Sequence, residues 1–184
     1  DKRTVAAVTD EVLTSAAVDD RIGLTARLYR AFHQAWPTTE TLAGLVARRD
    51  RGVKLDVIAA ELAAAPAYTA RYGSLRDADL VRALYRDLLG REAQAVEVAD
   101  GQRLLSTGMT RAGFVLRVAG SVEHRNRLQA ESRVHAIWFS LVRRTPTSTE
   151  LSTWTNRLRT GTPSVTAVTG LLSSDEYLRR FPRP

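Results

Sequence analysis

The sequence predicts an all-α protein built from three tandem repeats of a three-helix unit, preceded by an N-terminal helix. Two observations support this fold class. Apolar residues recur at the three- and four-residue spacing of amphipathic helices, and no segment sustains the period-two alternation of a half-buried strand. The 184-residue chain also repeats itself. Its period of roughly 50 residues indicates a helical array. We expect the repeats to pack as one compact or short solenoid-like array.

Three glycines, Gly52, Gly108 and Gly161, mark equivalent points in the copies. An aromatic residue precedes each glycine at a constant spacing, and a tyrosine or histidine and then an arginine follow each glycine at constant spacings. The aligned residues are Tyr29, Tyr85 and Trp138, then Tyr68, His124 and Tyr177, then Arg71, Arg127 and Arg180. Agreement at several positions without an internal gap indicates duplication rather than chance.

This register sets the predicted boundaries of the copies. Residues 1–20 are expected to hold the N-terminal helix, over 4–18 and outside the repeats, and the copies span residues 21–73, 74–129 and 130–184. Each copy reads as helix, loop, helix, glycine, helix and a short final turn. The glycine follows a helix in each case and is expected to take the left-handed conformation that ends it.

Helical stripes are clearest in the second copy, and capping signals mark helix starts in the third. Thr147 with Glu150, and Ser173 with Glu176, have the spacing of a capping box. Thr162 before Pro163 is typical of an N-cap followed by a proline at the first helical position. The second-copy stripes are Leu80, Leu84 and Leu88, then Val98 and Leu105, then Phe114 and Val118.

Composition excludes several classes of function. The formal net charge is +7, and all basic residues but Lys2 and Lys54 are arginine, the side chain that binds phosphate and carboxylate best. Without cysteine there is no disulfide framework, thiolate nucleophile or cysteine-based metal site. No apolar run approaches the roughly 18 residues of a membrane span. The chain begins at Asp1 without a signal segment, so we expect a removed leader or a fragment of a longer protein.

Short motifs in the second and third copies resemble a known family. "LYRDLLGRE" at 84–92 precedes Gly108 and "SVEH" at 121–124, and "SSDEY" at 173–177 is the matching end of the third copy. The pattern over roughly residues 22–182 resembles the bacterial domain of unknown function 4214 and, more distantly, the linker domains of phycobilisomes. This resemblance implies a helical, usually secreted or surface-associated module with no established catalysis.

The chain also departs from that family pattern. The acidic residue expected after the "GRxP" motif is missing in both copies, and the tryptophan of the second helix survives only as Trp154. Nothing here resembles glycine-aspartate calcium repeats, so the resemblance implies no calcium for this segment. Ala93 and Gln94, and Pro146 and Thr147, stand where the acid is expected, and Leu45 and Gly101 stand in place of tryptophan.

No residue pattern predicts catalysis, a metal site or a cofactor. The three histidines are interpreted as packing residues because no spacing of converging metal ligands occurs; they are His33, His124 and His135. A polysaccharide-active enzyme would need two carboxylates facing one cleft, which sequence leaves open for Glu92 and Glu97. No nucleophile elbow or phosphate-binding glycine loop is present. We therefore expect a protein that is not an enzyme.

Two tryptophans are the candidate ligand-binding residues. Trp36 lies in an inter-helix loop and is unshared by the other copies, so it is either a loop-packing residue or an exposed stacking surface for a sugar or partner. Trp154 is the second candidate. The arginine clusters are dispersed among acids, which argues against nucleic acid and favours solvated faces.

These observations predict a non-catalytic extracellular or cell-surface module that binds an envelope or extracellular glycan or anchors a larger assembly. Stacked helical units offer extended binding surfaces. The alternative is a protein-only linker or scaffold that self-associates, and a second alternative is a polysaccharide-active enzyme. The expected partner is a glycan or a protein, without membrane insertion.

A pair of positions predicts two structural ion pairs. Arg91 and Arg144 precede their anchor glycines at one shared spacing, and Glu123 and Glu176 follow them at another. Both positions are alanine in the first copy, at Ala35 and Ala67. Joint loss is expected of bonded partners, because a lone, partly buried charge is costly. We predict that Arg91 bonds Glu123 and that Arg144 bonds Glu176, tying the first loop of each copy to its final turn.

Overall fold

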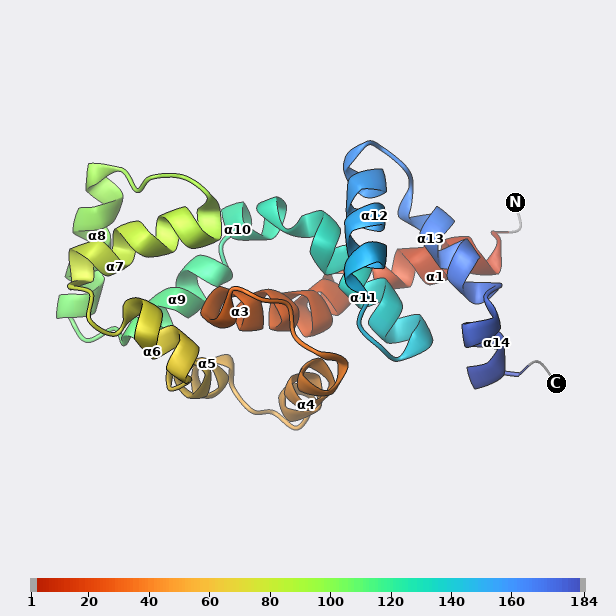
Figure 1. Ribbon diagram of the computed structural model, residues 1–184, viewed down its shortest axis with the longest axis horizontal. Helices are drawn as coiled ribbons and strands as arrows, with labels where there is room; N and C mark the ends of the chain where they lie inside the picture. Colours follow the sequence, from red (N-terminus) through yellow and green to blue (C-terminus); the bar gives the residue numbers. More distant parts are fainter. Residues whose placement is uncertain (1–2, 183–184) are drawn as a thin grey trace. The chain divides into compact units, whose positions relative to one another are not determined.

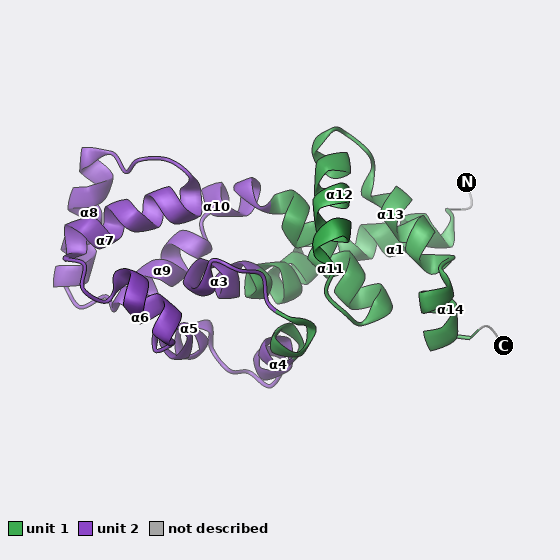
Figure 2. Ribbon diagram, viewed as in Figure 1, with its two compact units in different colours: residues 1–26, 38–43, 129–184 green, residues 27–37, 44–128 purple. Residues whose placement is uncertain are grey.

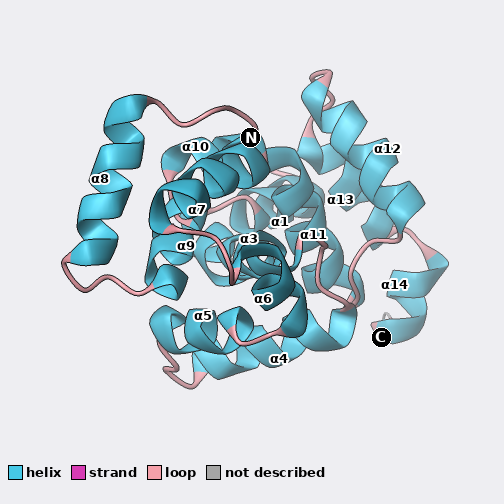
Figure 3. Ribbon diagram, turned by 60° about the vertical axis from the view of Figure 1, so that its left-hand side comes forward, coloured by secondary structure: helices cyan, strands magenta, loops and turns pink. Residues whose placement is uncertain are grey.

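A computed structural model of the protein describes residues 3–182. Every regular element within that range is a helix, and no strand occurs there (Figure 1, Figure 3). The all-α prediction is therefore confirmed. Gly52, Gly108 and Gly161 have φ of 86°, 105° and 93°, and each follows the end of a helix, so the left-handed helix ends are confirmed as well.

The helices follow a recurrent order along the chain. The chain begins with α1 (Val5–Leu13), α2 (Ala16–Val18) and the π-helical segment η1 (Asp19–Gly23). Next come α3 (Leu24–His33), α4 (Thr39–Asp50), α5 (Leu55–Ala63) and α6 (Pro66–Tyr72). They are followed by α7 (Asp77–Leu84), the π-helical η2 (Tyr85–Leu89), α8 (Ala95–Ser106), α9 (Arg111–Ala119) and α10 (Val122–Arg127). The last are α11 (Gln129–Val142), α12 (Ser148–Arg159), α13 (Ser164–Leu172) and α14 (Asp175–Arg180).

These helices form two compact units (Figure 2). Unit 1 takes the described residues of Asp1–Ala26, Thr38–Ala43 and Gln129–Pro184. Unit 2 takes Arg27–Pro37 and Gly44–Leu128. Helices α3 and α4 therefore contribute residues to both units.

Unit 2 has its core between α5, α7, α8 and α9. Helix α5 packs against α9, and α7 packs against α8. The leucine stripe expected in the first helix of the second copy is buried: Leu80 and Leu84 are 0% exposed and Leu88 is 2% exposed. Phe114 and Val118 of α9 join the same core. Burying large apolar side chains of this kind supplies the main stabilising free energy of the unit.

Unit 1 is organised around α11. This helix packs against α12, α13 and η1, and α1 packs against α13. Ile137 and Trp138 of α11 are buried, together with Val168 of α13 and Leu13 of α1. The N-terminal helix is thus part of the core of this unit rather than an appendage.

Several local expectations were wrong by a few residues. The helix expected over 4–18 is broken, because Ser15 has an extended backbone and its hydroxyl accepts from the Val18 amide at 3.4 Å. Serine and threonine hydroxyls compete in this way with continued helix. The expected final turn of each copy is a short helix, namely α6, α10 or α14.

Two predicted helix starts shift by one residue, and one is correct. Ser174, not Ser173, caps α14 and accepts from the Tyr177 amide at 3.2 Å. Ser173 instead ends α13 as its C-cap, and its hydroxyl donates to the Thr169 carbonyl at 3.0 Å. Pro163 itself has the extended N-cap conformation of α13, where Thr162 was expected. The capping box at the start of α12 is confirmed.

Candidate functional site

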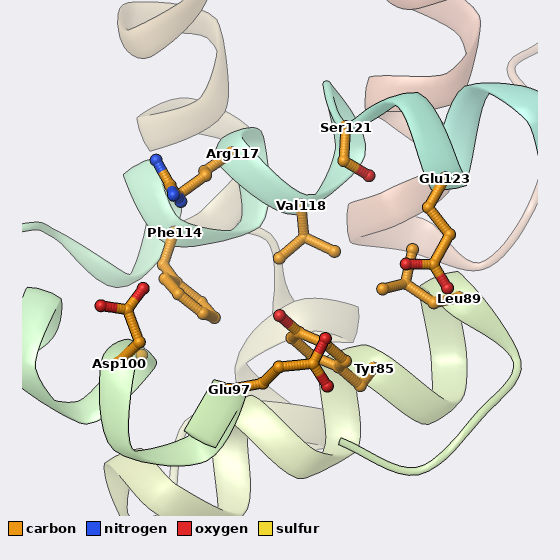
Figure 4. A pocket seen from close by; sticks show the side chains of 10 residues that line it. Tyr85, Leu89, Glu97, Asp100, Phe114, Arg117, Val118, Ser121 and Glu123 are labelled. Carbon is orange, nitrogen blue, oxygen red and sulfur yellow. The ribbon is translucent and has the colours of Figure 1, made fainter. Parts of the chain in front are cut away.

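The candidate site is a pocket of about 370 Å³ in unit 2 (Figure 4). Helix segments η2, α8, α9 and the start of α10 surround it, and its size lies within the range of small-ligand sites. Asp100 and Arg117 stand at one end and Glu123 at the other, with Tyr85 and Glu97 between them (Figure 4). The remaining lining residues are Leu89, Gly101, Phe114, Val118 and Ser121.

The close packing of α8 beneath the pocket depends on Gly101. A Cβ at this position would lie 2.5 Å from a methyl carbon of Val81 and 3.0 Å from the ring of Phe114. Real Cβ atoms do not approach neighbours so closely, so α8 can lie against α7 and α9 only if the residue has no side chain. Gly101 thus fixes the depth at which Glu97 and Asp100, on the same helix, reach the pocket.

One wall of the pocket is fixed by Arg91. Its Nε and Nη2 donate to the two carboxylate oxygens of Glu123 at 2.6 and 2.9 Å. Its Nη1 and Nη2 also donate to the two oxygens of Glu97, both at 2.8 Å. The guanidinium lies 5.1 Å from the ring centroid of Tyr85, a cation–π distance. One arginine thereby joins the loop before α8 to the starts of α8 and α10.

An arginine in unit 1 makes the same contacts. Arg144 Nε and Nη2 donate to the oxygens of Glu176 at 2.8 and 2.9 Å. Its Nη1 and Nη2 donate to those of Glu150 at 2.7 and 2.8 Å. The structure therefore brings together both arginine–glutamate pairs that the sequence singled out.

Each of these networks has a third member that the sequence interpretation missed. Glu97 and Glu150 occupy one aligned position in the second and third copies, and the first copy has Thr41 there. They could have been found, because the acid is absent from the copy that lacks the arginine. Glu150 was assigned to a capping box alone, and its second oxygen was not given a partner.

Arginine contact holds all four glutamates ionised. Hydrogen bonding by Arg144 lowers the pKa of Glu150 to about 2. Hydrogen bonding by Arg91 likewise lowers the pKa of Glu97 and of Glu123, and Arg144 lowers that of Glu176. A carboxylate that accepts bidentate bonds from guanidinium is favoured in its charged form.

Other polar groups of the pocket are available to a ligand. Within residues 3–182, the hydroxyl of Tyr85 and the guanidinium of Arg117 form no hydrogen bond. Burial raises the pKa of Tyr85, so the hydroxyl keeps its proton at neutral pH. Asp100 accepts one bond from Arg103 at 2.5 Å and keeps further lone pairs exposed. The pocket therefore offers donors and acceptors beside the apolar side chains of Phe114 and Val118.

The two candidate tryptophans lie outside this pocket and in different units. Trp36 is half-buried in the loop after α3, with the guanidinium of Arg30 5.1 Å from its ring. Trp154 of α12 is half-buried against Trp138, with ring centroids 6.0 Å apart, and Arg157 lies 4.9 Å from its ring. Each ring thus has one face against the protein, and the ligand role of both residues stays a prediction.

The histidines have neighbours that fit packing roles. His124 is 1% exposed, its Nδ1 lies 2.9 Å from the Ala119 carbonyl oxygen, and burial lowers its pKa to about 4. His33 stacks on Tyr29 at 4.2 Å between ring centroids, and His135 Nδ1 lies 2.9 Å from the Glu131 carbonyl oxygen. Among the described residues, no group of three or more histidine and acidic side chains is placed to hold a metal ion.

Comparison with known proteins identifies one stretch of the chain. Residues 59–128 match the family model described as "Domain of unknown function (DUF4214)", which confirms the resemblance for that stretch. All ten residues that line the pocket fall inside it. No curated protein and no solved structure matches the chain significantly. Over the described range, every helix is too short or too polar to cross a bilayer.

Proposed function

We propose that this protein, whose residues 59–128 match the model of that family of domains of unknown function, is a non-catalytic module that holds one unit of an envelope or extracellular glycan in the pocket of unit 2. One observation carries the proposal. The Tyr85 hydroxyl and the Arg117 guanidinium, which form no hydrogen bond within residues 3–182, line a pocket that the apolar side chains of Phe114 and Val118 also line. Sugars present that same combination of C–H faces and hydroxyl groups.

The chemistry of the pocket matches a sugar ring in detail. Phe114 and Val118 offer apolar surface to the C–H face, since aromatic and aliphatic side chains favour such contact. Arg117 and the Tyr85 hydroxyl can donate to ring or hydroxyl oxygens, and Asp100 can accept from hydroxyl groups. Few, well-placed polar groups around an apolar surface are the usual makeup of a ligand pocket.

The state of the carboxylates supports binding rather than hydrolysis. A glycosidase needs one carboxylic acid whose pKa is raised so that it can protonate the leaving group. Arg91 instead lowers the pKa of both Glu97 and Glu123 and occupies their oxygens. Glu92, the other acid that the sequence left open, is exposed and lies 3.8 Å from Arg86. Neither arrangement favours a general acid at neutral pH.

We also propose that the helices are three copies of one unit arranged as a short array. Helix lengths support this: α4, α8 and α12 have 12 residues each, and α5, α9 and α13 have nine each. The second and third copies would then carry the same arginine network, around Arg91 and Arg144, and would differ in the residues near it. Following the family resemblance, we place the protein outside the cell or on its surface.

Glycan-array binding with pocket variants tests the function. The protein should bind at least one class of bacterial polysaccharide, and Arg117→Ala or Asp100→Asn should weaken binding at least about tenfold, the loss of one or two hydrogen bonds to charged groups. Arg125→Ala and Glu92→Gln are matched controls, since they change equal charges on exposed side chains outside the pocket. Binding that both pairs of variants leave unchanged, or no binding at all, would refute the proposal.

A protein-only scaffold is the second candidate function, because α1 exposes a row of valines. It predicts concentration-dependent self-association in sedimentation velocity experiments, without any glycan binding. Turnover of an envelope polysaccharide by the purified protein would instead support the enzyme alternative.

A further inference from the structure

Helix α1 and the segment after it repeat the second half of a copy. Helices α1, α5, α9 and α13 each have nine residues, and each is followed by a two-residue break and a further short helix. The break after α1 is Thr14–Ser15, and the break after α9 is Gly120–Ser121. This sequence of elements is what α5 to α6, α9 to α10 and α13 to α14 share.

Capping residues of this segment agree with the repeat register. Ser15, Ser121 and Ser174 stand at one aligned position, and each hydroxyl accepts from the amide three residues on, at 3.4, 3.1 and 3.2 Å. Thr4 and Thr110 are likewise aligned, and each caps its nine-residue helix by accepting at 3.2 and 3.0 Å.

The arginine of the register is present as well. Arg21 follows Ser15 at the same spacing by which Arg127 follows Ser121 and Arg180 follows Ser174. Residues 1–20 were expected to lie outside the repeats, with the first copy beginning at Arg21; the caps at Thr4 and Ser15 and the spacing of Arg21 favour placing residues 4–21 inside the pattern instead.

One face of α1 differs from its equivalents in exposure. Val8 is 46% exposed and Val12 is 57% exposed. Their counterparts in α9, Phe114 and Val118, are 3% and 6% exposed, and those in α13 are buried to a similar degree. Leu13, on the opposite side of α1, is 8% exposed and lies in the core of unit 1.

Packing partners explain this difference. The third helix of the first copy, α5, packs against the third helix of the second copy, α9. Helix α1 packs against α13, the third helix of the third copy, in a contact of the same kind. Helix α9 also packs against η2 of its own copy, and α13 packs against α11 of its own. Helix α1 also contacts α11, yet Val8 and Val12 remain exposed, so within residues 3–182 no helix covers this face of α1.

We propose that the open face of α1, formed by Val5, Val8 and Val12, docks a pair of helices of the same repeat type. The occupant would be an amphipathic hairpin with the leucine stripe that α7 and η2 present to α9. The reason is that the aligned helices α9 and α13 pack against η2 and α11 of their own copies, and the exposed valines at i, i+3 and i+7 of α1 form one stripe. The proposal rests on the three-copy arrangement and not on the glycan pocket.

A chain with an added hairpin tests this docking directly. A copy of residues 76–109, placed before Thr4 in place of the first three residues, puts α7, η2 and α8 in register with α1. We expect the extended protein to melt at least about 5 °C higher than the original, because new apolar surface is buried. The same extension with its copies of Leu80, Leu84 and Leu88 changed to serine should give no increase.

Lysine substitutions locate the contact. Val12→Lys should shift the melting temperature of the original protein by no more than about 2 °C, and should lower that of the extended protein by at least about 5 °C. Val57→Lys, at an exposed valine of α5, is the control and should act equally in both. Equal effects of Val12→Lys in the two proteins, or no stabilisation by the extension, would overturn the docking proposal. So would a dimer of the original chain that Val12→Lys dissociates, because a second copy would then cover the face. Glycan binding affects none of these readouts.

Discussion

The Arg91 and Arg144 networks use the same donor and acceptor atoms, yet the residues around them differ. Each guanidinium bridges two glutamates through four hydrogen bonds of 2.6–2.9 Å. Beside Arg91 the helix α8 carries Gly101, whereas beside Arg144 the aligned residue of α12 is Trp154. The network is therefore common to these two regions, and the aligned positions 101 and 154 of the neighbouring helix distinguish them.

A large and a small residue have exchanged places between these regions. Gly101 faces Phe114 in unit 2, and at the aligned positions of unit 1 stand Trp154 and Ala167. Phe114 is 3% exposed and Ala167 is 1% exposed. In unit 2 the aromatic ring of the pair is on α9, as Phe114, and in unit 1 it is on α12, as Trp154. Such exchanges preserve packed volume while they move an aromatic surface from α9 to α12. The pocket belongs to the copy with the ring on α9.

Introducing tryptophan at position 101 gives the largest expected effect. Gly101→Trp should destabilise unit 2 by on the order of 4 kcal/mol, because its Cβ alone would overlap Val81 and Phe114. Adding Phe114→Ala should recover at least half of the loss by recreating the pair of the third copy. Chemical denaturation measures both variants. Gly44→Ala, in helix α4 with no atom near its Cβ, is the control and should not destabilise. A double variant no better than the single one would refute the exchange.

Acid should destabilise the protein first through His124. Burial lowers the pKa of His124 to about 4, below the unfolded value of about 6.5, so the unfolded state binds the proton more readily. Stability is then complete above pH 6.5 and falls by about 3 kcal/mol as the pH drops to 4. The aligned positions hold tyrosine, at Tyr68 and Tyr177. In the variant His124→Tyr, the free energy of unfolding should therefore change less between pH 6.5 and pH 4. Denaturant titrations from pH 7 to pH 4 check it, and equal slopes in both proteins would count against it.

Removing the guanidinium of unit 1 should have a moderate effect. Arg144→Met should cost about 2 kcal/mol, since it leaves Glu150 and Glu176 facing each other at 30% and 33% side-chain exposure. Below pH 4 the cost should shrink, because the stabilisation from Glu150 is complete above its ordinary pKa of 4.5 and is lost progressively as the pH falls towards its folded pKa of about 2. Thermal melts at pH 7 and pH 3 measure this. Arg179→Met, at an exposed arginine of α14, is the control.

The smallest expected effect separates the two networks. Arg91→Met should destabilise less than Arg144→Met, because Arg91 is 36% exposed against 28% for Arg144, and Glu123 is 45% exposed. In 1 M NaCl the cost of Arg91→Met should fall further, since salt screens exposed pairs more strongly. Melting temperatures at low and high salt give the comparison. A larger loss at Arg91 would show that exposure does not rank the networks.

Contacts that recur between the repeats were predictable from this sequence, and the pocket and the exact helix ends were not. Arg91 and Glu123 could be paired because two copies preserve both residues and one lacks both. The pocket could not be predicted, because it depends on how closely α8 approaches Val81 once Gly101 has no side chain. The break at Ser15 was missed since a hydroxyl that bonds the backbone competes with helix by a small margin. These outcomes are decided by local geometry, which periodicity does not contain.

The sharing of one guanidinium between two glutamates has an evolutionary consequence. A contact of three charged residues cannot arise from three uncharged ones by one substitution, so any stepwise route between the two states contains an incomplete network. Ala35, Thr41 and Ala67 show that one copy lies at the uncharged end of such a route. The side chains of the network in unit 2 are 24–45% exposed, so water offsets part of the cost of leaving one partner unpaired.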